Sequence, residues 1–141
     1  MHQLAKYGFV EQVTGSDHRE RPWRLVATSL SHDGLEDKPG GAAAVAVYEQ
    51  VAGERALENF LDWQERRSRW PAGFREHSGL GRSTVYLTED ELAGLVAAFE
   101  TLIADYTDQR PLDDLASRPP GSVPVDFSLF VVPREPTSGG H

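Results

Sequence analysis

Apolar and polar positions within residues 1–30 predict the end of a helix followed by a β-hairpin. Residues 2–7 have helical spacing, and Gly8 stands where a left-handed helix cap forms most easily, because glycine has no Cβ to clash there. The stretch from Phe9 to Val13 predicts a short strand. A polar turn leads to a second predicted strand from Trp23 to Ala27, and we expect the two strands to pair.

Two longer stretches predict the main helices. Residues 42–67 form the first, and Gly53 interrupts its apolar stripe, which indicates a kink or a close contact. The second helix starts at Thr88, because Thr88 and Glu91 have the spacing of a capping box. The apolar residues of this second helix recur at the three- and four-residue spacing of one helical face. They are Leu92, Leu95, Val96, Phe99, Leu102, Ile103 and Tyr106.

Two segments that flank the second helix predict the strands of a small sheet. Residues 83–87 are a short apolar run, and residues 123–132 alternate between two faces. One face holds Val123, Val125, Phe127, Leu129 and Val131. A parallel pair would form a right-handed βαβ unit, and an antiparallel pair is equally open. The sequence therefore predicts an α+β fold.

Composition and charge limit the classes of function. The chain has 141 residues and a net charge of −8, which argues against nucleic-acid binding by the chain as a whole. Residues 1–30 carry four basic and three acidic groups, a net charge of +1, so the remainder carries −9. The sequence has no cysteine, no apolar run of the ~18 residues that span a membrane, and no signal peptide. We expect a cytoplasmic protein without disulfides.

No set of side chains has the spacing of a catalytic or metal site. The five histidines are scattered, and none has a second ligand four residues away on a helix. The adjacent pair His77 and Ser78 has no identifiable third group, and neighbouring residues seldom present the geometry of a base and a nucleophile. We therefore expect no enzyme, no metal and no cofactor.

Four aromatic residues lie close together in the middle of the sequence: Trp63, Trp70, Phe74 and Tyr86. They could line a pocket for an effector, although their pattern favours a core beneath a small sheet. The neighbouring run Arg66, Arg67 and Arg69 is typical of a solvated helix end, where the helix dipole favours cations.

The order of short motifs along residues 3–133 resembles that of a known family. The stretch LAKYGFVEQV is similar to the end of a recognition helix, and GSDHRERPWRLVAT is similar to a two-stranded wing. Trp70-Pro71-Ala72-Gly73-Phe74, Tyr86-Leu87-Thr88, Glu91-Leu92 and Pro124-Val125 then follow in the order of the module appended to such proteins. The chain thus resembles ArsR-like winged helix-turn-helix transcriptional regulators of the actinobacterial kind.

This resemblance implies a domain organisation. Residues 1–30 would be part of a winged-helix DNA-binding domain, residues 31–41 a linker, and residues 42–133 a dimerisation or effector-like module. Residues 134–141 are expected to be a disordered tail. The helices that precede a recognition helix in that family are missing before Met1, so we expect an N-terminally truncated member or a start that lies further upstream.

The same resemblance implies partners and contact residues. DNA contacts would come from the helix remnant and the wing tip, which contribute His2, Gln3, Lys6, His18, Arg19 and Arg21. Without the missing helices, DNA binding is expected to be weakened, with a homodimer as the functional form and a small-molecule effector of unknown identity. The alternative is an interaction or dimerisation module that does not bind DNA and that acts as a dominant-negative regulator fragment.

Overall fold

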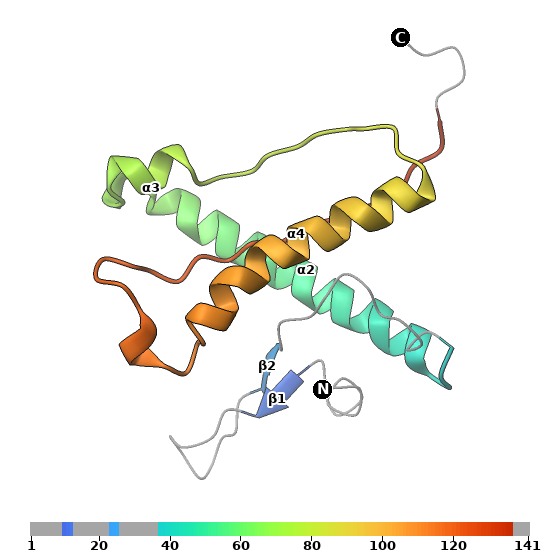
Figure 1. Cartoon of the computed structure of the whole chain (residues 1–141), viewed down its shortest axis with the longest axis horizontal. Helices are drawn as coiled ribbons and strands as arrows, with labels where there is room; N and C mark the ends of the chain where they lie inside the picture. The colour runs from blue at the N-terminus through green and yellow to red at the C-terminus, as the bar shows by residue number, and fades with distance from the viewer. Residues whose placement is uncertain (1–9, 13–22, 26–36, 137–141) are drawn as a thin grey trace.

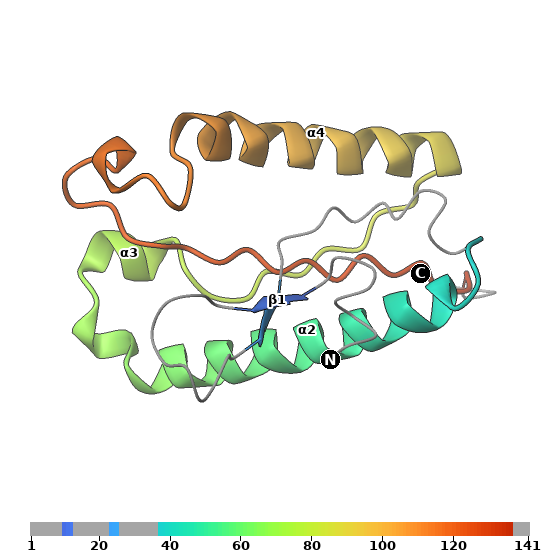
Figure 2. The same cartoon turned by 90° about the horizontal axis from the view of Figure 1, so that it is seen from below.

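A computed structural model of the chain describes residues 10–12, 23–25 and 37–136. Helices make up 57% of residues 37–136. The two long helices are α2 (Gly41–Glu65) and α4 (Glu89–Gln109). They cross in projection in Figure 1, and Figure 2 shows them as separate layers with extended segments of the chain running between them. No helix in the described part of the chain is both long and apolar enough to cross a membrane.

The helix α2 begins directly after a glycine turn. Gly40 has a φ angle of 74°, a left-handed conformation that glycine adopts without steric cost, and its carbonyl accepts a hydrogen bond from the Ala44 N–H. Ala44 and Val45 are the buried hydrophobic residues among those described, with 0% and 4% of their surfaces exposed. The helix predicted at 42–67 is therefore confirmed, with slightly different ends.

Gly53 marks a close contact in α2, one of the two outcomes that its position predicted. A Cβ atom built on Gly53 would lie 3.4 Å from Cε1 of Phe130. The edge of the Phe130 ring therefore lies where α2 has no side chain. This contact joins the end of the chain to the middle of α2.

Two short helices follow α2. They are the 3₁₀ turn η1 (Arg67–Arg69) and the helix α3 (Ala72–Glu76). Pro71 precedes α3, and its carbonyl accepts hydrogen bonds from the N–H groups of Phe74 and Arg75. Proline suits this place because its missing N–H would have no partner at a helix start.

The helix α4 has the start that the sequence predicted. The Thr88 N–H donates to Oε1 of Glu91 at 3.0 Å, and the Glu91 N–H donates to Oγ1 of Thr88 at 3.2 Å. This reciprocal pair confirms the capping box. The chain then turns through η2 (Leu115–Ser117), where a carboxylate oxygen of Asp114 accepts from the Ala116 N–H.

The predicted α+β fold is wrong. Residues 83–87 and 123–132 are extended, but neither segment forms a strand, so the small sheet is absent from residues 37–136 in both its parallel and its antiparallel form. The physical reason is that a strand needs a hydrogen-bonded neighbour. The alternating pattern fixes which side chains share a face, and it does not supply that neighbour within one chain.

One strand pair is described, near the N-terminus. Strand β1 (Val10–Gln12) pairs antiparallel with β2 (Trp23–Leu25), with Glu11 opposite Arg24. These residues lie inside the two segments that were predicted to form a hairpin. A pair of three-residue strands is marginal by itself. It does not make the molecule α+β or establish a wing, and the predicted turn between the strands lies outside the described residues.

Candidate functional site

The residues expected to contact DNA all lie outside the described part of the chain. They are His2, Gln3, Lys6, His18, Arg19 and Arg21. The helix remnant at 2–7 and most of the linker at 31–41 lie outside it as well, as do residues 137–141 of the tail. The prediction of a DNA-contacting surface therefore remains a prediction from the sequence.

The residues considered for chemistry in the sequence are placed by the structure as follows: the described region shows no metal-ligand cluster, and Ser78 bonds to the backbone. No group of three or more His, Asp or Glu side chains there could hold a metal ion. The hydroxyl of Ser78 donates its hydrogen bond to the carbonyl oxygen of Phe74, one turn earlier in the chain. This bond ties Ser78 to the end of α3.

The basic run after α2 forms one side of a shallow hollow. The hollow has a volume of about 460 Å³ and is lined by Arg67, Ser68, Ala72, Arg75 and Glu76. All five residues are exposed, and they include two arginines and one glutamate. An open hollow of mixed charge keeps its polar groups in contact with water. None of the four aromatic residues expected to line an effector pocket lines this hollow, and it lacks the enclosed, mostly apolar walls that such pockets have.

The four aromatic residues of the predicted cluster separate into different environments. Trp63 stacks on Phe60 with the ring centroids 6.0 Å apart, and the guanidinium of Arg67 lies 4.8 Å from the Trp63 ring centroid. Trp70 meets Phe74 edge-on at 5.7 Å. Tyr86 is 82% exposed. The predicted core under a sheet is therefore wrong, because the segment that carries Tyr86 forms no strand and leaves this side chain exposed.

The helix α4 carries an apolar face that is only partly covered. Leu92, Val96, Phe99 and Ile103 are half-buried, but Leu95, Leu102 and Tyr106 of the same stripe are exposed. The stripe predicted from the sequence is present, and α4 contains no buried residue. Its first turn holds only acidic residues, which the positive end of the helix dipole favours.

The extended segments expose further apolar side chains. Tyr86 and Val85 do so between α3 and α4, and Phe127, Phe130 and Val132 do so near the end of the chain. Altogether, nineteen large hydrophobic residues are exposed in the described region. Large exposed apolar patches on a monomer usually mark a surface that binds another molecule. The sequence showed which residues are apolar, but it gave no sign that they would be uncovered.

Hydrogen bonds at the start of α4 change the ionisation of Glu91. The backbone N–H of Thr88, and after it the Thr88 side chain, lower the pKa of Glu91 from its ordinary value. Hydrogen bonds to a carboxylate stabilise its charged form, so Glu91 stays ionised to lower pH. Glu91 is fully exposed, and its role in the described structure is to close the helix end.

Comparison with known proteins assigns no family. The chain matches no family model, no curated protein and no solved structure. The resemblance to ArsR-like regulators therefore rests on the motifs of the sequence alone.

Proposed function

We propose that this chain is a non-catalytic dimerisation module, and that it belongs to a cytoplasmic transcriptional regulator that binds DNA through its N-terminal residues. The observation that carries the proposal is the uncovered apolar surface of α4 and of the extended segments. A second copy of the chain is the partner that we assign to this surface.

The quantity of exposed apolar surface is sufficient for a dimer. Complete burial of one Val, Leu or Phe side chain is worth about 1.5–3 kcal/mol. A dissociation constant near 1 μM requires about 8 kcal/mol, in addition to the ~4–15 kcal/mol lost in translational and rotational freedom. Burial of about ten of the nineteen exposed residues on each copy would supply a free energy in that range.

Sedimentation equilibrium of the full chain tests the proposal. The monomer has a mass of 15.6 kDa, and we expect twice that mass at concentrations of about 1–100 μM. Far-ultraviolet circular dichroism on the same samples should show the helices of the described region. A helical chain that stays at 15.6 kDa across the whole range would contradict the proposal.

DNA binding is the second part of the proposal, and the charge of residues 1–30 supports it. This segment has a net charge of +1, whereas the rest of the chain carries −9. A dimer would present two such segments, and regulators that bind paired half-sites use two copies in this way. Each segment has few cations, so we expect weak binding that falls steeply with salt.

Fluorescence anisotropy with a labelled duplex from the DNA upstream of the gene tests this second part. We expect binding at low salt that weakens in the double variant Arg19→Ala/Arg21→Ala. The matched control is Arg55→Ala/Arg82→Ala, which removes the same charge from two exposed residues elsewhere in the chain and should bind as the wild type does. Equal losses in the two double variants, or no binding at low salt, would show that these residues do not contact DNA.

A further inference from the structure

We infer that residues 123–132 form the centre of the dimer, where this segment of one copy pairs antiparallel with the same segment of a second copy about a two-fold axis at Phe127. The inference rests on the proposed dimer and specifies where the two copies meet. It differs from a sheet within one chain, which the structure does not have, because the pairing exists only between copies.

The backbone of this segment is free to pair. No N–H or C=O group of residues 123–132 makes a hydrogen bond within the described part of the chain. Pro124 is the single residue without an N–H, and it stands near the start of the segment, where proline disturbs a strand least. An extended, unpaired segment of this kind is the template to which another strand adds.

The side chains of the segment are exposed as well. Phe127 is 67% exposed, and Val125, Leu129 and Val131 of the same face are also uncovered. The opposite face includes Phe130, which reaches Gly53 of α2. The segment thus contacts α2 through Phe130, while most of its other face is exposed and Val123 on that face is half-buried. Figure 2 shows it running between the layers of α2 and α4.

The sequence of the segment is complementary to itself when it pairs antiparallel. With the axis at Phe127, Val125 lies opposite Leu129, and Val123 lies opposite Val131. All apolar residues of one face then stay on one face, as the two-residue repeat of a strand requires. Asp126 is the single charge of the segment, and in this register it faces Ser128 rather than a second carboxylate. Like charges directly opposite would destabilise the pair.

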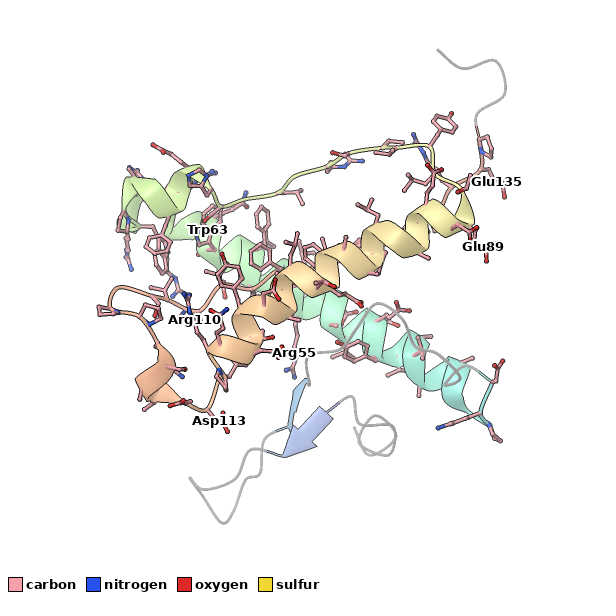
Figure 3. All side chains as sticks on the ribbon, viewed as in Figure 1. Arg55, Trp63, Glu89, Arg110, Asp113 and Glu135 are labelled. Carbon is pink, nitrogen blue, oxygen red and sulfur yellow. The ribbon has the colours of Figure 1, made fainter. Side chains whose placement is uncertain are left out.

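The distribution of charge also favours a two-fold arrangement. Each copy carries −8, so two copies repel one another overall. Residues 66–76 are locally basic, with four arginines and one glutamate, whereas the first turn of α4 is acidic. Figure 3 places Trp63, beside the basic stretch, and Glu89, in the acidic turn, at opposite ends of the molecule. A two-fold axis across the middle of the segment exchanges these ends between copies and brings unlike charges to the same side.

Disulfide trapping in the full chain tests the inference directly, because the chain has no cysteine of its own. In an antiparallel pair, a residue on the axis lies beside its own copy. A residue two places away lies about 13 Å from its copy along the strand. A disulfide requires Cα atoms within about 7 Å of one another. Phe127→Cys should therefore cross-link with itself under mild oxidation, whereas Val125→Cys and Leu129→Cys should not.

A mixture of two single variants tests the same pairing while Phe127 stays in place. Val125→Cys and Leu129→Cys face each other across the proposed pair, so the mixed sample should form the heterodimer, which mass spectrometry identifies by its mass. The matched control is Ser83→Cys, an exposed serine of the other extended segment, which should stay uncross-linked. We expect yields at least tenfold higher for Phe127→Cys and for the mixture than for the other samples.

The outcomes separate this inference from the proposed function. If sedimentation shows a dimer and all cysteine variants, including Ser83→Cys, cross-link equally or not at all, the pairing at 123–132 is wrong and the dimer forms elsewhere. If sedimentation shows a monomer, the dimer and the pairing are both wrong. A maximum at Phe127→Cys together with the mixed heterodimer supports the inference.

Discussion

The helices α2 and α4 differ in how regular their sequences are and in how much of each is buried. The helix α4 has the regular apolar stripe and the complete capping box, yet none of its residues is buried. The helix α2 has no side-chain cap and an interrupted stripe, yet it contains Ala44 and Val45, the buried hydrophobic residues of the described region. A regular apolar stripe therefore shows that a helix has a face to cover, and it does not show that the same chain covers it.

The largest effect should come from placing a charge in the buried part of α2. Val45→Asp puts an unpaired carboxylate at a side chain that is 4% exposed, and we expect it to lower the free energy of unfolding by about 3 kcal/mol or more. Ala46→Asp is the matched control, because Ala46 is the exposed neighbour of Val45 on the same helix, and it should change that free energy by no more than about 0.5 kcal/mol. Urea denaturation followed by circular dichroism measures both. Equal losses would show that Val45 is not part of a core.

The next effect should appear in the association of α4 rather than in its folding. Leu95→Asp and Leu102→Asp add charges to exposed residues of the stripe, so the helix should keep its circular dichroism signal. In the proposed dimer the new carboxylates would lose their contact with water. We therefore expect each variant to raise the dissociation constant at least tenfold, which corresponds to about 1.4 kcal/mol. Ala97→Asp, on the opposite side of the helix, is the control. If sedimentation gives the same dissociation constant for all three, α4 lies outside the interface.

The contrast also separates what the sequence could predict from what it could not. The capping box of α4 is local, because Thr88 and Glu91 contain all the atoms of the motif, and it was predicted correctly. The position of Gly53 likewise indicated a close contact, although the sequence could not name Phe130 as the neighbour. Features that depend on three or four adjacent residues are fixed by those residues.

The prediction of a small sheet was wrong because a sheet depends on residues far apart in the sequence. The alternation in residues 123–132 is real, but the partner of a strand is chosen by the fold and can belong to another chain. The prediction of an aromatic core was wrong for a similar reason, because Trp63 stacks on Phe60, Trp70 meets Phe74, and Tyr86 is exposed. The site expected for DNA lies outside the described residues and stays a prediction.

A smaller effect is expected at the start of α4, where the cap holds a helix that lacks buried residues. Thr88→Ala removes the acceptor for the Glu91 N–H, and we expect a loss of about 1 kcal/mol in the free energy of unfolding. Thr101→Ala is the matched control, since its hydroxyl donates only to the Ala97 carbonyl, which already belongs to the helix. Chemical denaturation of both variants checks the difference. A control that loses as much stability as Thr88→Ala would show that the box contributes nothing specific.

The smallest effect concerns the pH dependence that the same box gives to α4. The Thr88 backbone N–H, with its hydroxyl as the second cause, lowers the pKa of Glu91 below the ordinary value of 4.5. A carboxylate whose pKa is lower in the folded state contributes stability at pH values above its unfolded pKa, and this contribution disappears as the pH falls through its folded pKa.

We therefore expect the wild type to lose more stability than Glu91→Gln between pH 5 and pH 3 (about one unit either side of the ordinary carboxylate pKa). Thermal melting of both proteins across this range measures the difference, and parallel curves would mean that the Thr88 bonds do not favour the ionised side chain. The helix α2 has no carboxylate in its first turn, so any such acid sensitivity belongs to α4 and distinguishes the two helices in solution.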